Sequence, residues 1–334
     1  MQLAHEKWFV DDPGLFPTDW SFALRPLTLS LLAAVVLVTV AWRWVAYRLP
    51  TPELAPLRRL GGITPYLPRL LAIHLGVSLL ALAARGFFLS ADLELHRLPA
   101  GSVIGLAEGA LGVWLITGVR LRAAALLLVA IGPVALAATG PVSLLEAADL
   151  VGIAGFLALV PPTNRPYGAA DPDPRMLRYG LLALRAGVAV ALVSLAFSEK
   201  LANPAMARAI VAHYPQLDVF SYVGLDVPVD AFVAIAGAVE VLFGLLVLSG
   251  AMPQVAVLVA AVPFNATLLV FGSTELLGHL PVYGVFLTLL AYGSDPRTAE
   301  AVRWLPTPAR PRAADVREGA DVRNRADVRE GAPA

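Results

Sequence analysis

The sequence predicts an all-α membrane protein with about nine transmembrane helices, arranged as two parallel four-helix repeats plus one extra N-terminal span. Three observations predict this class. First, 58% of the 334 residues are hydrophobic and only 15% are charged, a composition outside the range of soluble domains. Second, apolar runs of about the length that crosses a bilayer recur along the chain. Third, one of these runs, residues 232–250, carries a single acid, and its pattern occurs twice.

The single acid of this run is Glu240. At helical spacing it lies on the same face as Gly237 and Gly244, and small residues on such a face let a neighbouring helix approach closely. An acid that faced lipid would cost about 2.5 to 3.5 kcal/mol on insertion scales. We therefore expect Glu240 to face protein or a hydrated cavity.

The strip around Glu240 has a counterpart in the first half of the chain. Four pairs of residues are each separated by 132 positions: Gly105 and Gly237, Glu108 and Glu240, Gly112 and Gly244, Gly118 and Gly250. Earlier in each half, Leu75-Gly76 and Ala186-Gly187 are separated by 111 positions, and later Glu146 and Gly155 precede Glu275 and Gly284 by 129. The pattern predicts two four-span units, and an even number of spans gives both units the same orientation.

The apolar runs and the loops between them predict seven segments. The order is an extracytoplasmic N-terminal segment (1–25), a first transmembrane helix (26–48), a cytoplasmic linker (49–69), a first four-helix unit (70–162), a second cytoplasmic linker (163–177), a second four-helix unit (178–293) and a disordered cytoplasmic tail with ADVREG-type repeats (294–334). The second unit contains a long loop whose segment 204–214 is either a short interfacial helix or an ordinary helical connector.

The distribution of charge predicts orientation and excludes several kinds of site. Arginine is concentrated in alternate connectors, which places the N-terminus outside and the C-terminus in the cytoplasm of a bacterial cytoplasmic membrane. The formal net charge is zero, so the lipid bilayer and not nucleic acid is the expected partner. The absence of cysteine excludes disulfides and thiolate ligands, and we expect no metal site.

The second unit carries several recognisable features in order. They are the opening helix LLALRAGVAVALVSLAFSEKL with Arg185 and Lys200, a loop that ends in GLDVPVD, the helix GAVEVLFGLLVLSG with Glu240, and a closing helix with Glu275. With these features the second unit resembles the DoxX family of small four-span membrane proteins. The first unit resembles the family more weakly, because it has His74 in place of Arg185 and FFLSADLEL in place of FSEKL. The resemblance implies a link to membrane redox chemistry, with a quinone as cofactor and a redox enzyme as partner subunit.

The candidate binding residues are Glu240, Lys200, Glu275 and Arg185, and the repeat-equivalent acids are Glu108 and Glu146. One hypothesis is an outward-facing polar pocket in the second unit, where Lys200 pairs with Glu240 or with Glu275. The alternative is that these acids only mark helix ends and hydrogen-bond helices together. Arg185 lies in the inner part of its span, where it either extends to the headgroups or pairs across the bundle.

Three functional hypotheses follow. The leading one is a DoxX-like membrane subunit associated with redox or quinone chemistry. The second is a carrier for a small lipophilic or anionic solute, which the acids inside the membrane suggest. The third is a membrane anchor whose tail recruits a partner protein. Whether the chain is itself an enzyme and whether it forms a homo-oligomer stay open at this stage.

Overall fold

Helices make up most of the computed structural model, which describes residues 6–10, 13–162 and 168–306. The α-helices are α1 (Trp20–Ala23), α2 (Pro26–Ala46), α3 (Leu67–Ala84), α4 (Gly101–Thr117), α5 (Leu121–Thr139), α6 (Pro141–Glu146), α7 (Ala148–Leu159), α8 (Pro174–Leu195), α9 (Pro204–His213), α10 (Val229–Ser249), α11 (Pro253–Phe271), α12 (Ser273–Ser294) and α13 (Ala299–Arg303). The short strands β1 (Phe87–Phe88) and β2 (Ser90–Glu94) form an antiparallel hairpin. Short helices of other types are η1 (Glu6–Phe9), η2 (Pro13–Leu15), η3 (Ala55–Tyr66), η4 (Leu95–Arg97), the π-helix η6 (Ala196–Leu201), η7 (Pro215–Leu217) and η8 (Ser221–Val223).

Several helices are long and apolar enough to cross a membrane. Within the described residues there are six such helical segments, which contain α2, α3, α8, α10, α11 and α12, and α4, α5 and α7 are shorter apolar helices. The outer face of α2 fits a lipid environment, because Leu37 is 70% exposed and Val40 is 63% exposed. The predicted class of a helical membrane protein therefore agrees with the structure.

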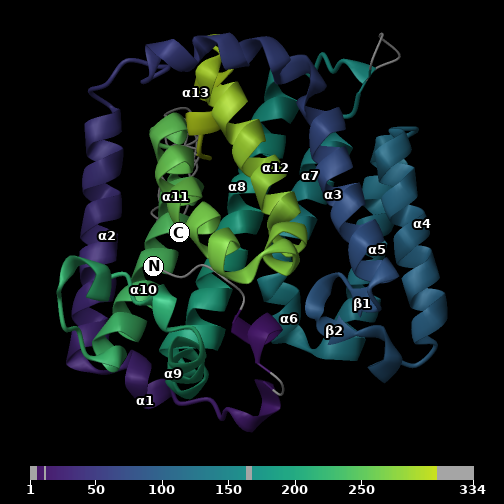
Figure 1. The fold of residues 1–334 in the computed structure, drawn as a ribbon. Helices are drawn as coiled ribbons and strands as arrows, with labels where there is room; N and C mark the ends of the chain where they lie inside the picture. The colour runs from purple at the N-terminus through teal and green to yellow at the C-terminus, as the bar shows by residue number, and fades with distance from the viewer. Residues whose placement is uncertain (1–5, 11–12, 163–167, 307–334) are drawn as a thin grey trace, which may run out of the picture. The chain divides into compact units, whose positions relative to one another are not determined.

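The helices stand side by side, with the shorter elements gathered at their two ends (Figure 1). At one edge α2 packs on α10, which in turn packs on α8. At the other edge α4 packs on α3 and on α5. The helices α7 and α12 contact each other, and they pack on α8 and α3 respectively. In Figure 1 the β1–β2 hairpin, α1 and α9 lie at the end of the bundle opposite to α13.

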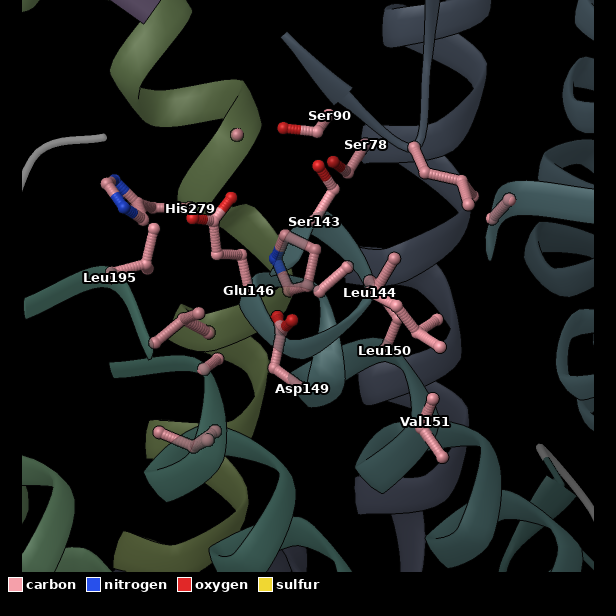
Figure 2. Close-up of a pocket in the computed structure, with 18 of the residues that line it drawn as sticks. Ser78, Ser90, Ser143, Leu144, Glu146, Asp149, Leu150, Val151, Leu195 and His279 are labelled. Atoms are coloured by element: carbon pink, nitrogen blue, oxygen red, sulfur yellow. The ribbon is translucent and has the colours of Figure 1, made fainter. Parts of the chain in front are cut away.

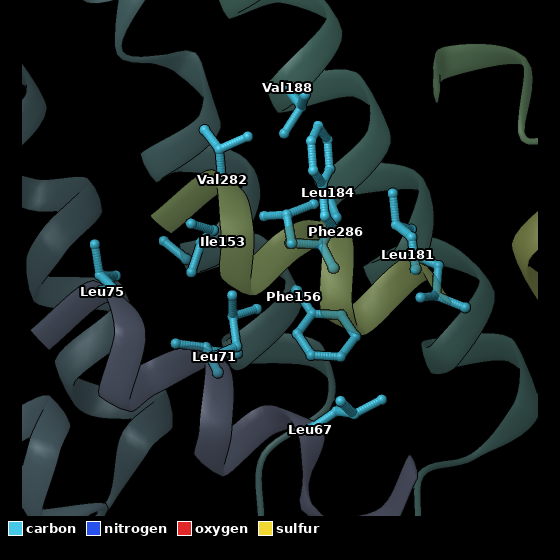
Figure 3. Close-up of a cluster of buried hydrophobic side chains, with 14 of the residues drawn as sticks. Leu67, Leu71, Leu75, Ile153, Phe156, Leu181, Leu184, Val188, Val282 and Phe286 are labelled. Carbon is cyan, nitrogen blue, oxygen red and sulfur yellow. The ribbon is translucent and has the colours of Figure 1, made fainter. Parts of the chain in front are cut away.

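The central helices meet through large apolar side chains and close glycine contacts. Leu71, Phe156, Leu184 and Phe286 belong to one buried cluster that joins α3, α7, α8 and α12 (Figure 3). A Cβ atom at Gly152 of α7 would lie 2.6 Å from the carbonyl oxygen of Ala183 in α8, so only glycine allows the two backbones to approach this closely.

Two predicted spans are interrupted in the structure, and both interruptions bear on the site. The last apolar run of the first unit is divided into two helices. Its first helix, α6, starts at Pro141, and the break before α7 lies at Ala147. The first helix of the second unit, which the sequence predicts to start at residue 178, begins earlier, at Pro174. After Leu195 it continues as the π-helix η6. A π-helical turn adds a residue to the backbone ring and changes the direction of the side chains that follow it, and such turns are frequent at functional sites.

The prediction of a disordered tail from residue 294 is wrong for the part that the structure describes. The short helix α13 packs on α8 and α12, and its residues Ala299 and Val302 are fully buried. These two apolar side chains supply the burial that an isolated polar tail lacks. Residues 307–334, with the ADVREG-type repeats, lie outside the described residues.

Candidate functional site

The π-helix η6 positions two charged side chains inside the bundle. Lys200 Nζ lies 3.1 Å from Glu240 Oε2 of α10 and 4.0 Å from Glu199 Oε2. All three side chains are at most 1% exposed. A buried charge is costly unless it is paired, so the ammonium of Lys200 offsets the cost of burying the carboxylate of Glu240.

A second buried pair lies on α12. His279 Nδ1 is 3.3 Å from Glu275 Oε1, one helical turn away, and both side chains are at most 4% exposed. Neither carboxylate oxygen of Glu275 has a hydrogen-bond partner with good geometry among the described residues. Of the two acids proposed to pair with Lys200, the structure therefore brings Glu240 to the lysine, while Glu275 contacts His279.

Glu146 at the end of α6 forms a third centre of contacts. Its carboxylate forms an ion pair with Lys7 of η1 and accepts a hydrogen bond from the hydroxyl of Ser198 in η6. These contacts bring together residues that are 139 and 52 positions apart in the chain. Glu146 thus links the N-terminal segment, α6 and the π-helical end of α8.

A pocket of about 80 Å³ lies beside these groups (Figure 2). Most of its lining is apolar, and its polar side chains are Trp8, Ser78, Ser90, Ser143, Glu146, Asp149 and His279. This pocket is not confined to the second unit: both carboxylates that line it come from the first half of the chain, and His279 comes from the second. The reason is that α7 packs on α8 and α12, so the ends of both halves meet here.

Electrostatic interactions join the pocket to the buried ion pair. Glu240 interacts with the charges of His279 and Glu146 as well as with Lys200, and Asp149 interacts with His279. The connected groups include more carboxyl groups than basic groups. Among the described residues, no group of three or more acids and histidines is arranged to hold a metal ion.

Glu108 and Arg185 lie apart from this network. One oxygen of Glu108 accepts a hydrogen bond of 2.8 Å from the backbone N–H of Leu89, and its other oxygen has no partner among the described residues. Arg185 is fully buried and donates hydrogen bonds to the carbonyl oxygens of Leu248 and Trp304. It therefore caps the C-terminal end of α10 and holds the segment after α13, and it does not line the pocket.

Several residues of the site were not predicted as binding residues. Trp8 lines the pocket from the N-terminal segment, Lys7 pairs with Glu146 of the lining, and Ser198 of the π-helix η6 donates to the same carboxylate. Asp149 and His279 could have been found, since both are polar residues next to apolar runs, near the same predicted membrane face. Nothing in the sequence pattern points to the contacts of Lys7 and Trp8.

Comparisons with models of known protein families, with curated proteins and with solved structures found no match for this chain.

Proposed function

We propose that the chain is a DoxX-like integral membrane protein that serves as the membrane subunit of a redox assembly, and that its pocket binds the ring of a quinone. The observation that carries this proposal is that the pocket connects two different environments. Val129 and Val151 line it and are 45% and 48% exposed on the apolar outside of the bundle. Glu146 and His279 line it and are buried. A ligand with an apolar tail and a polar ring matches this arrangement.

The size of the pocket favours a head group over a whole solute. A volume of about 80 Å³ is well below the several hundred Å³ of pockets that enclose drug-sized ligands. A ring can enter such a space while its isoprenoid tail stays among the lipid chains. The imidazole of His279 and the hydroxyls of Ser78, Ser90 and Ser143 are groups of the kind that donate hydrogen bonds to a quinone carbonyl.

The contacts between helices support the two-repeat part of the proposal. With α3, α4, α5 and α7 as the first unit, and α8, α10, α11 and α12 as the second, each contact in one unit has an equivalent in the other. The packing of α3 on α4 matches that of α8 on α10, and the packing of α5 on α7 matches that of α11 on α12. Between the units, α7 packs on α8 as α12 packs on α3. The last helix of each unit thus packs on the first helix of the other, as expected of two units related by an axis along the membrane normal.

The equivalent acids of the two units also have equivalent neighbours. An offset of 111 relates Leu89 to Lys200, and an offset of 132 relates Glu108 to Glu240. Glu108 accepts from the backbone of Leu89, and Glu240 pairs with the side chain of Lys200. The same two positions are therefore in contact in both units, but only the second unit has a cation there. We propose that the buried ion pair belongs to a single functional site in each chain.

We further propose nine spans in a bacterial cytoplasmic membrane, with the N-terminus outside and the C-terminus inside. The arginines support this orientation: Arg43, Arg69 and Arg185 all donate to carbonyl oxygens at the C-terminal ends of α4 or α10, which lie on the proposed cytoplasmic side. Reporter enzymes fused after residues 98 and 168 would test it. Activity of a periplasmic reporter at 98 and not at 168 is expected, and the reverse pattern would overturn the orientation.

The experiment that tests the function is quinone binding by the purified protein. We expect mass spectrometry to detect co-purified quinone, and added short-chain quinone to bind saturably and raise the melting temperature of the apo-protein. His279→Leu should abolish this shift, whereas Gly62→Ala, at a position with no neighbouring atom within 4 Å, should preserve it. Absence of saturable binding, or equal shifts in both variants, would refute the proposal. Solute-dependent proton flux in liposomes would support a carrier instead, and a partner captured only with residues 307–334 present would support an anchor.

A further inference from the structure

Trp8 of the N-terminal segment sits against the polar side of the pocket. Its ring centroid lies 5.4 Å from that of His279, and its Nε1 donates a hydrogen bond of 3.2 Å to Ser90 Oγ. A Cβ atom at Gly278 would lie 2.0 Å from Cη2 of the Trp8 ring. The indole therefore fills a space that exists only because residue 278 is glycine and has no side chain.

Two further contacts hold the same short segment in place. Lys7 forms the ion pair with Glu146, and its side chain is 18% exposed. Phe9 stacks on Phe271 of α11 with ring centroids 4.0 Å apart, and it lies edge-on to Tyr214 at 6.5 Å. The segment Glu6–Phe9 is thus attached to the bundle through three adjacent side chains, each of which contacts a different part of it.

The attachment is of a reversible kind. A single partly exposed ion pair and a single aromatic pair each contribute little to stability compared with the packing of a buried helix. The segment is one 3-10 turn of four residues, so its own hydrogen bonds add little. A short segment held by contacts of this kind is released at a much lower cost than the unfolding of a transmembrane helix.

We infer that the segment Glu6–Phe9 is a lid over the pocket. When the lid is closed, the ammonium of Lys7 pairs with the carboxylate of Glu146; when it is open, a polar group of the ligand binds that carboxylate instead. The second part rests on the proposed function: a quinol hydroxyl replaces the Lys7 ammonium as the hydrogen-bond donor to Glu146. Both groups are donors, and a carboxylate accepts either of them. With the lid closed, Trp8 shields His279 and Lys7 neutralises Glu146.

The absence of cysteine allows a direct test of the lid. Ser143 lines the pocket and is half-buried, so Ser143→Cys reports on its accessibility. In detergent-purified protein, Lys7→Ala, Trp8→Ala and Gly278→Leu should each raise the rate at which a bulky water-soluble maleimide labels this cysteine by about tenfold, because the rate follows the open population. Lys7→Arg should preserve the slow rate. Ser102→Cys, at an exposed site outside the pocket, should label equally in all backgrounds.

Gly278→Leu and Trp8→Ala open the lid in opposite ways. The first fills the space that the indole of Trp8 takes up, and the second removes the indole. A structural defect at one residue would not reproduce both results. If Ser143→Cys labels at the same rate in the parent and in all three lid variants, the lid does not exist. If Lys7→Arg labels as fast as Lys7→Ala, the charge of Lys7 does not hold the lid, and competition between Lys7 and a ligand at Glu146 is refuted.

A second measurement separates failure of the lid from failure of the proposed function. Duroquinol is used as the probe, because its fully substituted ring has no position for addition of the reporter thiol. We expect it to protect Ser143→Cys from labelling in the Lys7→Ala background at about tenfold lower concentration than in the parent. Faster labelling in the lid variants without any protection would retain the lid and refute both quinol binding at Glu146 and the proposed function. Protection at equal concentrations in both backgrounds would retain quinol binding and refute competition by Lys7.

Discussion

Lys200 Nζ lies 3.1 Å from Glu240 Oε2, and this contact joins the π-helical end of α8 to the middle of α10. Both side chains are 1% exposed, so neither charge has water as an alternative partner. The pair therefore combines a structural role, the attachment of η6 to α10, with an electrostatic one, since Glu240 also interacts with His279 and Glu146 beside the pocket.

The two members of this pair should respond differently to substitution. Lys200→Met leaves both Glu199 and Glu240 without their cation, and we expect it to destabilise the protein by about 3 to 5 kcal/mol. Glu240→Gln should cost less, because Glu199 still faces Lys200 at 4.0 Å. The Lys200→Met/Glu240→Gln double variant should recover part of the loss. Unfolding in mixed micelles measures all three, and additive effects would contradict a direct coupling between the pair.

Glu108 provides the matching test in the first half of the chain. It is 1% exposed and accepts from the backbone N–H of Leu89, which stands where the second unit has Lys200. Glu108→Gln keeps an acceptor for this N–H and removes a carboxyl group from an apolar site, so we expect a change in stability within about 1 kcal/mol. Glu108→Leu should cost about 1 to 3 kcal/mol, because the N–H of Leu89 is then buried without a partner. A loss for Glu108→Gln as large as that for Glu108→Leu would show that the negative charge of Glu108 is needed, because Gln keeps the acceptor and removes only the charge.

Much of the fold could be predicted from the apolar runs alone. The first transmembrane helix predicted at 26–48 and the apolar run at 232–250 correspond to α2 and α10, because a segment that crosses lipid must be continuously apolar and such a run has visible ends in the sequence. The site is less predictable. Charge compensation allows Lys200 to pair with either Glu240 or Glu275, and the choice depends on the π-helical turn of η6, which has no signature in composition.

The contacts of the N-terminal segment could not be predicted at all. Lys7 and Glu146 are 139 positions apart, and neither the spacing nor the polarity of residues 6–9 distinguishes a lid from a surface segment. The packed segment before Trp304 was missed for a related reason. Its two buried apolar residues, Ala299 and Val302, are too few to stand out against the polar low-complexity sequence that follows them.

Asp295, just after α12, should make stability depend on pH. Burial raises the pKa of Asp295, but hydrogen bonds from Arg297 lower it by more, so the net effect is a pKa below the usual value. A depressed pKa means that the carboxylate contributes stability above the unfolded-state pKa of about 3.9, and that this contribution is lost as pH falls through the folded-state pKa. Asp295→Asn should therefore cost about 1 kcal/mol at pH 7 and less below about pH 4.

Melting temperatures of the parent and Asp295→Asn between pH 7 and pH 3 check this expectation. Glu300→Gln is the control, because its side chain is 74% exposed and it contacts Arg303 only at 3.9 Å. It should differ little from the parent across the range. A gap for Asp295→Asn that stays constant down to pH 3 would mean that the ionised carboxylate is not what stabilises this end of α12.

The contact between α3 and α4 should be the place where one added methyl group does most damage. A Cβ atom at Gly112 would lie 2.7 Å from the carbonyl oxygen of Gly76 and 2.9 Å from the backbone nitrogen of Leu80. Backbone atoms cannot rotate away as a flexible side chain can, so the helices must separate. We expect Gly112→Ala to cost about 1 to 3 kcal/mol despite the higher helix propensity of alanine.

Gly132 of α5 is the matched control, because a Cβ atom there meets nothing within 4 Å. Gly132→Ala should leave stability unchanged or raise it by up to about 1 kcal/mol through helix propensity alone. Unfolding of both variants in the same mixed micelles separates close packing from propensity. Equal and small effects would mean that α3 and α4 are held by something other than their glycine contact, and the equivalence between this pair and α8 with α10 would then lose its main physical support.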